Sequence, residues 1–164
     1  DGALSTTEAG SWVRVQKFTG PDTFTAGAQY AYRTDPISEL SPFIDVERSG
    51  MVDMLALPDG RVLTLERELG GVVPYFRSRV YLLDFTGATD VSALDTLTAG
   101  GFTPLTKTLL WQGVFGLSNF EGMALGPKFS DGGYGVLLVS DDGSGQLGQR
   151  QTIMNLVLDG VTAV

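Results

Sequence analysis

The chain has 164 residues, of which 43% are hydrophobic and 18% charged, a composition that excludes a disordered chain and suits one folded domain with its own core. Nineteen acidic against eleven basic residues give a formal net charge of −8, which disfavours nucleic acid and anionic membranes as partners. Cysteine and histidine are both absent, which excludes disulfides, Ser-His-Asp triads and His-ligated zinc within the chain. The chemistry left is that of carboxylates, hydroxyls, Lys, Arg and oxygen-ligated metals.

Short runs of β-branched, aromatic and aliphatic residues, separated by Gly, Pro, Asp and Ser, predict an all-β fold. "PDG" at 58–60 predicts a hairpin turn. Residues 90–101 favour a helix of two turns that ends at Gly100 and Gly101. No apolar run approaches the roughly 18 residues that a membrane-spanning helix needs. The predicted strands are residues 11–18, 28–34, 51–57, 61–67, 78–85, 107–113, 120–125, 135–141 and 152–159.

Two parts of the chain repeat. "VDMLALPDGRVLTLER" at 52–67 aligns with "FEGMALGPKFSDGGYGVLLVSD" at 120–141, so that Asp53 matches Glu121. A repeated unit of about four antiparallel strands that starts with an acidic residue is typical of a β-propeller blade. We therefore predict about two and a half blades of antiparallel four-stranded type, with repeats near 51–113 and 120–159.

The number of blades bears on how the domain is completed. A propeller ring needs about 4 to 8 blades, so fewer than three cannot close. We expect residues 1–164 to be a single domain or the C-terminal half of a larger propeller, with an N-terminal half as its partner. An independently closed β-sandwich of nine strands is the alternative.

Four sequence blocks carry a family resemblance: "SGMVDMLALPDGRVLTLERE", "YLLDFTGATDVS", "NFEGMALGP" and "VLLVSDD". In this order, over about residues 28–159, they resemble the C-terminal half of the bacterial phytase-like family named for the esterase-like activity of phytase. The resemblance implies an exported β-propeller, periplasmic or secreted, that hydrolyses phosphoric or carboxylic esters. The architecture is similar to that of calcium-dependent propeller phytases, whose acidic channel holds metal ions that bind phosphate. Ca²⁺ and a small phosphorylated or ester substrate are thus the implied cofactor and partner.

Acidic residues at strand ends are the candidate metal ligands. In a propeller blade the innermost strand runs along the central channel, so Asp53 and Glu121 would lie on one ring. Glu66, Asp141 and Asp142 end the second strands and would approach the channel or its mouth. Oxygen clusters of this kind suit Ca²⁺, which can polarise a phosphoryl oxygen and activate water. We predict all five carboxylates as metal ligands, with Glu121 and Asp142 also catalytic.

Arginine side chains are the candidate phosphate contacts, because a guanidinium can grip an oxyanion with two hydrogen bonds. Arg67 and Arg150 are the main candidates, and Arg79 is a third. Structural alternatives stand beside these roles. The acidic residues could instead bond backbone N–H groups of the next blade or pair with arginine, and Glu66–Arg67 could be a surface ion pair.

Two further motifs point to no chemistry. "GSGQLG" at 143–148 matches a dinucleotide-binding pattern, but the sequence after it is β-patterned, so we predict a hairpin loop. Ser118 lacks the nucleophile-elbow pattern and has no histidine base in this chain, so an esterase role would need a base from the N-terminal half. The leading hypothesis is a metal-assisted hydrolase of phosphoric esters that acts in an acidic propeller channel. The alternative is a non-enzymatic propeller module that binds a ligand or a protein partner.

Overall fold

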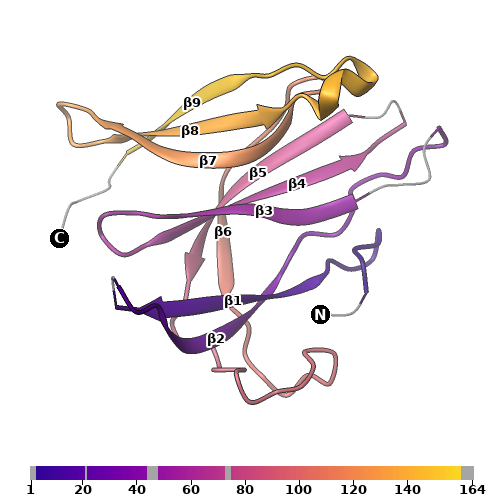
Figure 1. The fold of residues 1–164 in the computed structure, drawn as a ribbon. Helices are drawn as coiled ribbons and strands as arrows, with labels where there is room; N and C mark the ends of the chain where they lie inside the picture. The colour runs from indigo at the N-terminus through magenta and orange to yellow at the C-terminus, as the bar shows by residue number, and fades with distance from the viewer. Residues whose placement is uncertain (1–2, 21, 44–47, 73–74, 160–164) are drawn as a thin grey trace.

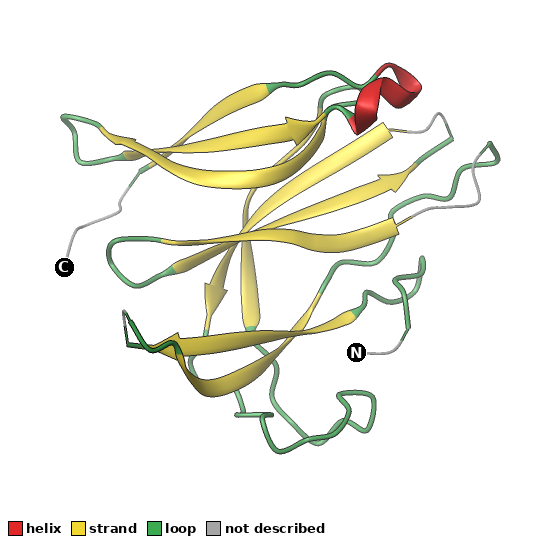
Figure 2. Cartoon of the chain, in the orientation of Figure 1, coloured by secondary structure: helices red, strands yellow, loops and turns green. Residues whose placement is uncertain are grey.

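The computed structural model describes residues 3–20, 22–43, 48–72 and 75–159 (Figure 1). All nine predicted strands are present, and the fold is all-β (Figure 2). The six-residue 3₁₀ helix η1, Gly143–Gly148, follows the eighth strand. The strands are β1 Trp12–Thr19, β2 Thr25–Arg33, β3 Arg48–Ala56, β4 Val62–Gly70, β5 Tyr75–Asp84, β6 Thr106–Val114, β7 Asn119–Lys128, β8 Tyr134–Asp141 and β9 Ile153–Leu158.

The strands form three antiparallel sheets, β1-β2, β3-β4-β5-β6 and β7-β8-β9. The sheets stack face to face, with the four-stranded sheet in the middle (Figure 1). Within each sheet the strands follow one another in chain order, as hairpin-connected strands of a propeller blade do. The middle sheet is one complete four-stranded blade, and the predicted repeats at 51–113 and 120–159 correspond to the second and third sheets.

The turn predicted at 58–60 joins β3 to β4. The N–H of Leu57 donates to the carbonyl of Arg61, and Gly60 has a φ of +83°, a left-handed conformation that glycine adopts without strain. Pairing of Ala56 with Val62 next to this turn fixes the register of the hairpin. The same end of the molecule carries the β1–β2 and β7–β8 turns (Figure 1).

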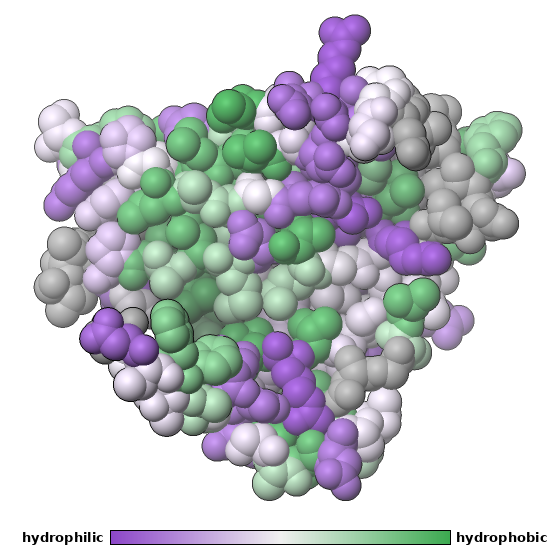
Figure 3. Space-filling view, viewed as in Figure 1, coloured by the Kyte–Doolittle hydropathy of each residue, from purple (hydrophilic) through white to green (hydrophobic). Residues whose placement is uncertain are grey.

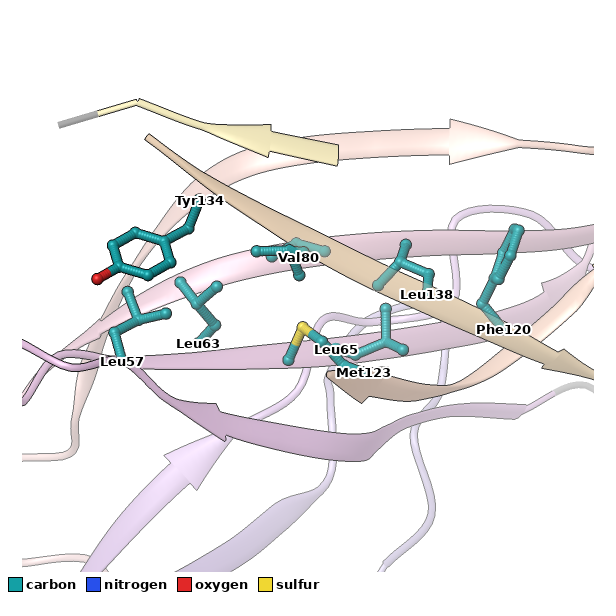
Figure 4. Packing of buried hydrophobic residues seen from close by; sticks show 9 residues of the cluster. Leu57, Leu63, Leu65, Val80, Phe120, Met123, Tyr134 and Leu138 are labelled. Atoms are coloured by element: carbon teal, nitrogen blue, oxygen red, sulfur yellow. The ribbon is translucent and has the colours of Figure 1, made fainter. Parts of the chain in front are cut away.

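The main core lies between the second and third sheets (Figure 4). Alternate residues of β4 and β8 point into it, because successive side chains of a strand face opposite sides. β4 and β8 thus bury one face against each other, and the hydrophobic effect holds the two sheets together. The buried members are Leu57, Leu63, Leu65, Val80, Phe120, Met123, Tyr134, Val136 and Leu138.

A second core joins the first two sheets, with Tyr32 and Leu83 among its buried members. The far side of β1–β2 is covered by the long connection between β5 and β6, through Val91 and Leu97. The helix predicted at 90–101 is wrong: this segment forms turns and bends, and Asp90 bridges to Tyr30 instead. Packing on the sheet overrides its weak helical pattern. Among the described residues, no helix is long and apolar enough to cross a membrane.

The main core generates a stability prediction. Leu138 is completely buried, whereas its neighbour Val139 is 44% exposed on the opposite face of β8. Leu138→Ala removes buried apolar surface and leaves a cavity, so the free energy of unfolding in urea should fall by about 2 to 5 kcal/mol. The matched variant Val139→Ala should lose less than about 1 kcal/mol. Equal losses for the two variants would contradict the assignment of faces.

Candidate functional site

The end of β4 and the start of β5 lie opposite the β3–β4 turn, on the right in Figure 1. There β4 reads Glu-Arg-Glu over 66–68 and pairs with Arg-Ser-Arg over 77–79 of β5. Because side chains alternate, the two glutamates of β4 face β1–β2, and Arg67 faces β7–β9. One end of the blade therefore carries two separate polar clusters, one on each face.

The first cluster, the buried ion network, comprises Asp35, Glu66, Glu68, Arg77, Arg79 and Lys107. The side chain of Glu66 has no exposed surface. Its Oε1 accepts hydrogen bonds from the Lys107 ammonium at 2.5 Å and from the Tyr32 hydroxyl, and its Oε2 accepts from the N–H of Asp35 at 2.8 Å. The alternative that Glu66 and Arg67 form a surface ion pair is wrong, because adjacent strand residues point to opposite faces.

Glu68 is the second buried carboxylate of the network. Its Oε2 lies 2.6 Å from Nη2 of Arg79 and accepts from the Ser38 hydroxyl, and its Oε1 accepts from the Ser38 N–H at 2.7 Å. Arg77 approaches the same carboxylate at 3.9 Å. An ionised carboxylate away from water is tolerated only when it is paired in this way. Arg79, a candidate phosphate contact, is therefore committed to this network.

Asp35 connects the network to solvent, with 31% of its side chain exposed. Lys107 lies 2.7 Å from its Oδ1, and the Tyr81 hydroxyl donates to its Oδ2. Burial acts to raise the pKa of Asp35, but the hydrogen bonds and charges of Lys107, Tyr81 and Arg79 outweigh it and hold that pKa below its ordinary value. Burial and the neighbouring carboxylates raise the pKa of Tyr32 and Tyr81 well above the usual tyrosine range.

The second cluster, the Arg67–Glu121 cluster, consists of Arg67, Ser78, Asn119 and Glu121. Oε1 of Glu121 lies 2.8 Å from Nη2 of Arg67 and 2.9 Å from Nδ2 of Asn119. The side chains of Arg67 and Glu121 are 21% and 37% exposed, so the pair is reachable from solvent. Two of the predicted site residues, one from β4 and one from β7, are thus brought together across two sheets.

Several polar atoms of this cluster are buried without a protein partner. They are Nε of Arg67, Oγ of Ser78 and Oδ1 of Asn119. Arg67 and Ser78 are paired directly across β4 and β5, so their side chains share one face. Among the described residues, Oε2 of Glu121 also has no hydrogen-bond partner. The cluster therefore keeps both donor and acceptor capacity beside an ion pair.

Asp53 has a different role from its repeat partner. Its Oδ1 accepts from the N–H of Met54 at 2.8 Å, and its Oδ2 accepts from the N–H of Met123 in β7 at 2.5 Å. A β-bulge explains the difference, since Val52 is the extra residue in β3, whereas Glu121 itself is the extra residue in β7. Asp53 thus joins two neighbouring inner strands, one of the structural alternatives for this position.

The remaining predicted residues lie around η1. Asp141 and Asp142 accept hydrogen bonds from the N–H groups of Gly143 and Ser144, at 3.1 and 2.9 Å, as the first residues of tight turns do. Arg150 is exposed, and its carbonyl oxygen accepts from Ser140. Asp141 pairs with Asn119 across β8 and β7, which places it at the same end of the third sheet as Glu121.

A Ca²⁺ site needs about 6 to 8 oxygen ligands. Within the described ranges, no group of three or more acidic side chains is arranged to hold a metal ion. Asp53 is engaged by backbone N–H groups, Glu66 by Lys107, and Glu121 by Arg67. These residues alone do not fit a calcium site, and the five metal ligands stay a prediction.

Two hollows of the described surface lie away from both clusters. One, of about 380 Å³, is bordered by Tyr30, Met54 and Phe85 between the first two sheets, and the other is a groove between β6 and β9. Figure 3 shows hydrophobic residues gathered left of the centre of the viewed face and hydrophilic ones toward its right. The polar chemistry and the apolar hollows thus occupy different parts of the molecule.

Comparison with known proteins identifies the family. A family model described as "Phytase-like: Esterase-like activity of phytase" matches residues 1–143. The chain belongs to the phytase-like family. This confirms the resemblance that the four sequence blocks predict, and with it the β-propeller character of the stacked antiparallel sheets. No curated protein and no solved structure matches the chain. The family model therefore supports an esterase-like kind of protein without a specific substrate.

Sequence reasoning missed most of the buried ion network. Glu68, Asp35 and Lys107 were not singled out, although Glu66 and Glu68 alternate around Arg67 in a strand whose other residues, apart from Thr64, are apolar or glycine. Opposite charges at alternate positions in neighbouring strands, "ERE" and "RSR", are the signal that could have identified Glu68. No local pattern marks Asp35 or Lys107, since each reaches Glu66 from a distant part of the chain.

Removing the cation beside Glu66 should destabilise the protein. Lys107→Met leaves the buried Glu66 carboxylate without its ammonium partner, so the free energy of unfolding should fall by about 3 kcal/mol or more. Adding Glu66→Gln to the same chain removes the uncompensated charge and should restore part of the loss. Urea denaturation measures both, with Lys17→Met at an exposed position as the control. A double variant less stable than Lys107→Met would contradict the pairing.

The lowered pKa of Asp35 generates a pH prediction. A carboxyl whose pKa is lower in the folded than in the unfolded protein stabilises the fold above its unfolded pKa and loses that effect as pH falls. The ordinary pKa of an aspartate carboxyl is 3.8. Between about pH 5 and pH 2, the unfolding free energy should therefore fall less steeply for Asp35→Asn than for the unmodified protein. Identical slopes for the two proteins would contradict the prediction.

Proposed function

We propose that the protein is an esterase-like hydrolase of phosphoric esters and that the Arg67–Glu121 cluster is its substrate site. Family membership supports the kind of reaction. One observation carries the choice of site: Arg67 and Glu121 lie 2.8 Å apart, partly open to solvent, beside buried polar atoms that have no protein partner. Unpartnered donors and acceptors next to an accessible carboxylate are what a bound polar substrate can use.

Each residue has a role in this proposal. The Arg67 guanidinium offsets the negative charge of the phosphoryl group, with the Ser78 hydroxyl as a second donor. Oε2 of Glu121 takes a proton from a water molecule whose oxygen attacks phosphorus. The new P–O bond forms as the ester P–O bond breaks, and the departing alkoxide takes a proton from solvent. General-base catalysis of this kind contributes about 10²- to 10⁴-fold to rate.

The proposal also includes assistance by a metal ion, although the steps assigned to Arg67, Ser78 and Glu121 do not involve it. Ca²⁺ remains the predicted cofactor, and Asp141 and Asp142 are the predicted ligands that lie nearest the start of η1 in the chain. When bound, Ca²⁺ would supply positive charge that polarises a phosphoryl oxygen. The described carboxylates do not form its complete ligand set, so further oxygen ligands are required.

A binding module is the second candidate function. One observation favours it: the predicted ligands Asp53 and Glu66 are engaged in contacts that join strands and sheets rather than in an open acidic channel. In that case the Arg67–Glu121 pair would also join two sheets. The two candidates differ in whether an ester is consumed.

An ester panel tests the proposal. The purified protein should release phosphate from phytate or nitrophenol from p-nitrophenyl phosphate, and Ca²⁺ should increase the rate relative to a chelator. Glu121→Gln keeps an acceptor for Arg67 but cannot accept a proton, so the rate should fall at least about 100-fold with unchanged thermal stability. Asp95→Asn is the matched control. Inactivity toward phosphoric and carboxylic esters, with and without Ca²⁺, would support the binding module instead.

A further inference from the structure

Two stacked rings form an aromatic platform at the end of β6. They belong to Trp111, within the strand, and to Phe115, just after it, and their centroids lie 5.9 Å apart with an angle of 14° between the ring planes. Gly113 lies between them in the chain. A Cβ at this position would come within 2.5 Å of the Phe115 ring and 2.8 Å of the Trp111 ring. The two rings therefore close over the bare backbone of Gly113, and a larger residue there would push them away.

Strand register places the aromatic platform beside the Arg67–Glu121 cluster. Ser78 of β5 pairs with Arg67 of β4 on one side and with Gly113 of β6 on the other. Residues paired across a sheet direct their side chains to the same face, and neighbouring strands lie about 4.8 Å apart. Ser78, whose buried hydroxyl has no protein partner, is therefore one strand away from Arg67 and one strand away from the rings.

Phe115 is open to solvent yet held in position. Its surface is 48% exposed. Its carbonyl oxygen accepts from the N–H of Ser118 at 3.1 Å, and the carbonyl of the next residue, Gly116, accepts from the N–H of Phe76 in β5 at 3.4 Å. The ring of Phe120 packs edge-on against it, with centroids 6.2 Å apart. An exposed ring that is already fixed loses little conformational freedom when a second ring stacks on it.

We infer that the aromatic platform is the subsite for the alcohol part of the substrate and that the phosphoric esters bound are those of aromatic alcohols. This subsite rests on the proposed function of the Arg67–Glu121 cluster, since it completes the same substrate. With the phosphoryl group beside Arg67 and Ser78, an aryl group joined to it through one oxygen extends along the same row toward Phe115. There it can make the offset-stacked or edge-to-face contact that aromatic pairs prefer, whereas an alkyl group cannot.

Phenylphosphonate and methylphosphonate are the probes, because their P–C bonds resist hydrolysis and only the first carries a ring. In NMR titrations the protein should bind phenylphosphonate at least tenfold more tightly. The indole N–H resonance of Trp111 should shift on binding, and that of Trp12, in the first sheet, should not. Phe115→Ala should reduce the preference for phenylphosphonate at least fivefold. Phe18→Ala is the matched control, since it removes a ring that is 55% exposed in β1, and it should keep the preference.

The contrary results separate this subsite from the hydrolase activity. Equal affinities for the two phosphonates, no measurable binding of either, or an unchanged preference in Phe115→Ala would overturn the aromatic subsite. Hydrolysis of phosphoric esters together with equal phosphonate affinities would contradict the subsite alone. Preference for phenylphosphonate together with inactivity toward every ester would support the subsite as a binding site and contradict the hydrolase activity. Matching amide spectra of the two variants without ligand establish that both are folded.

Discussion

Two glutamates held in β4 without solvent exposure are the constraint on which this end of the molecule depends. Glu66 and Glu68 can stay ionised there only because Lys107 and Arg79 offset their charge and nearby N–H and O–H groups satisfy their oxygens. These contacts join four parts of the chain to β4: β2 through Tyr32, the segment after β2 through Asp35, β5 through Arg79, and β6 through Lys107. β4 is held in place by these contacts, and Arg67 on its other face pairs with Glu121 of the third sheet.

The β-bulges in β3 and β7 give the two matching positions of the repeat different contacts. Asp53 and Glu121 match in sequence, yet Asp53 accepts a hydrogen bond from a backbone N–H of a neighbouring strand and Glu121 pairs with arginine. A bulge placed one residue earlier or later changes the direction of a side chain. The recurring acidic position therefore links adjacent sheets in both cases, and only the Glu121 version leaves a carboxylate oxygen available for chemistry.

The strands could be predicted from sequence because alternation and turn residues are local properties, as "PDG" between β3 and β4 shows. The same logic applied to neighbouring residues failed for Glu66 and Arg67, since adjacent strand positions face opposite ways. Residues 90–101 were mistaken for a helix because packing on β1–β2 decides their shape. Lys107 could not be linked to Glu66 by any pattern, because their contact joins positions far apart in sequence.

The buried ion network is electrically neutral, which determines where the net charge of the protein lies. Three acidic and three basic side chains take part in it, so their formal charges cancel. The whole excess of −8 therefore belongs to residues outside the network. An anionic ligand that approaches the Arg67–Glu121 cluster meets a field that repels it at long range, and dissolved salt screens that field over about 10 Å at 0.1 M. Encounter with such a ligand should speed up as ionic strength rises, which is the reverse of electrostatic steering.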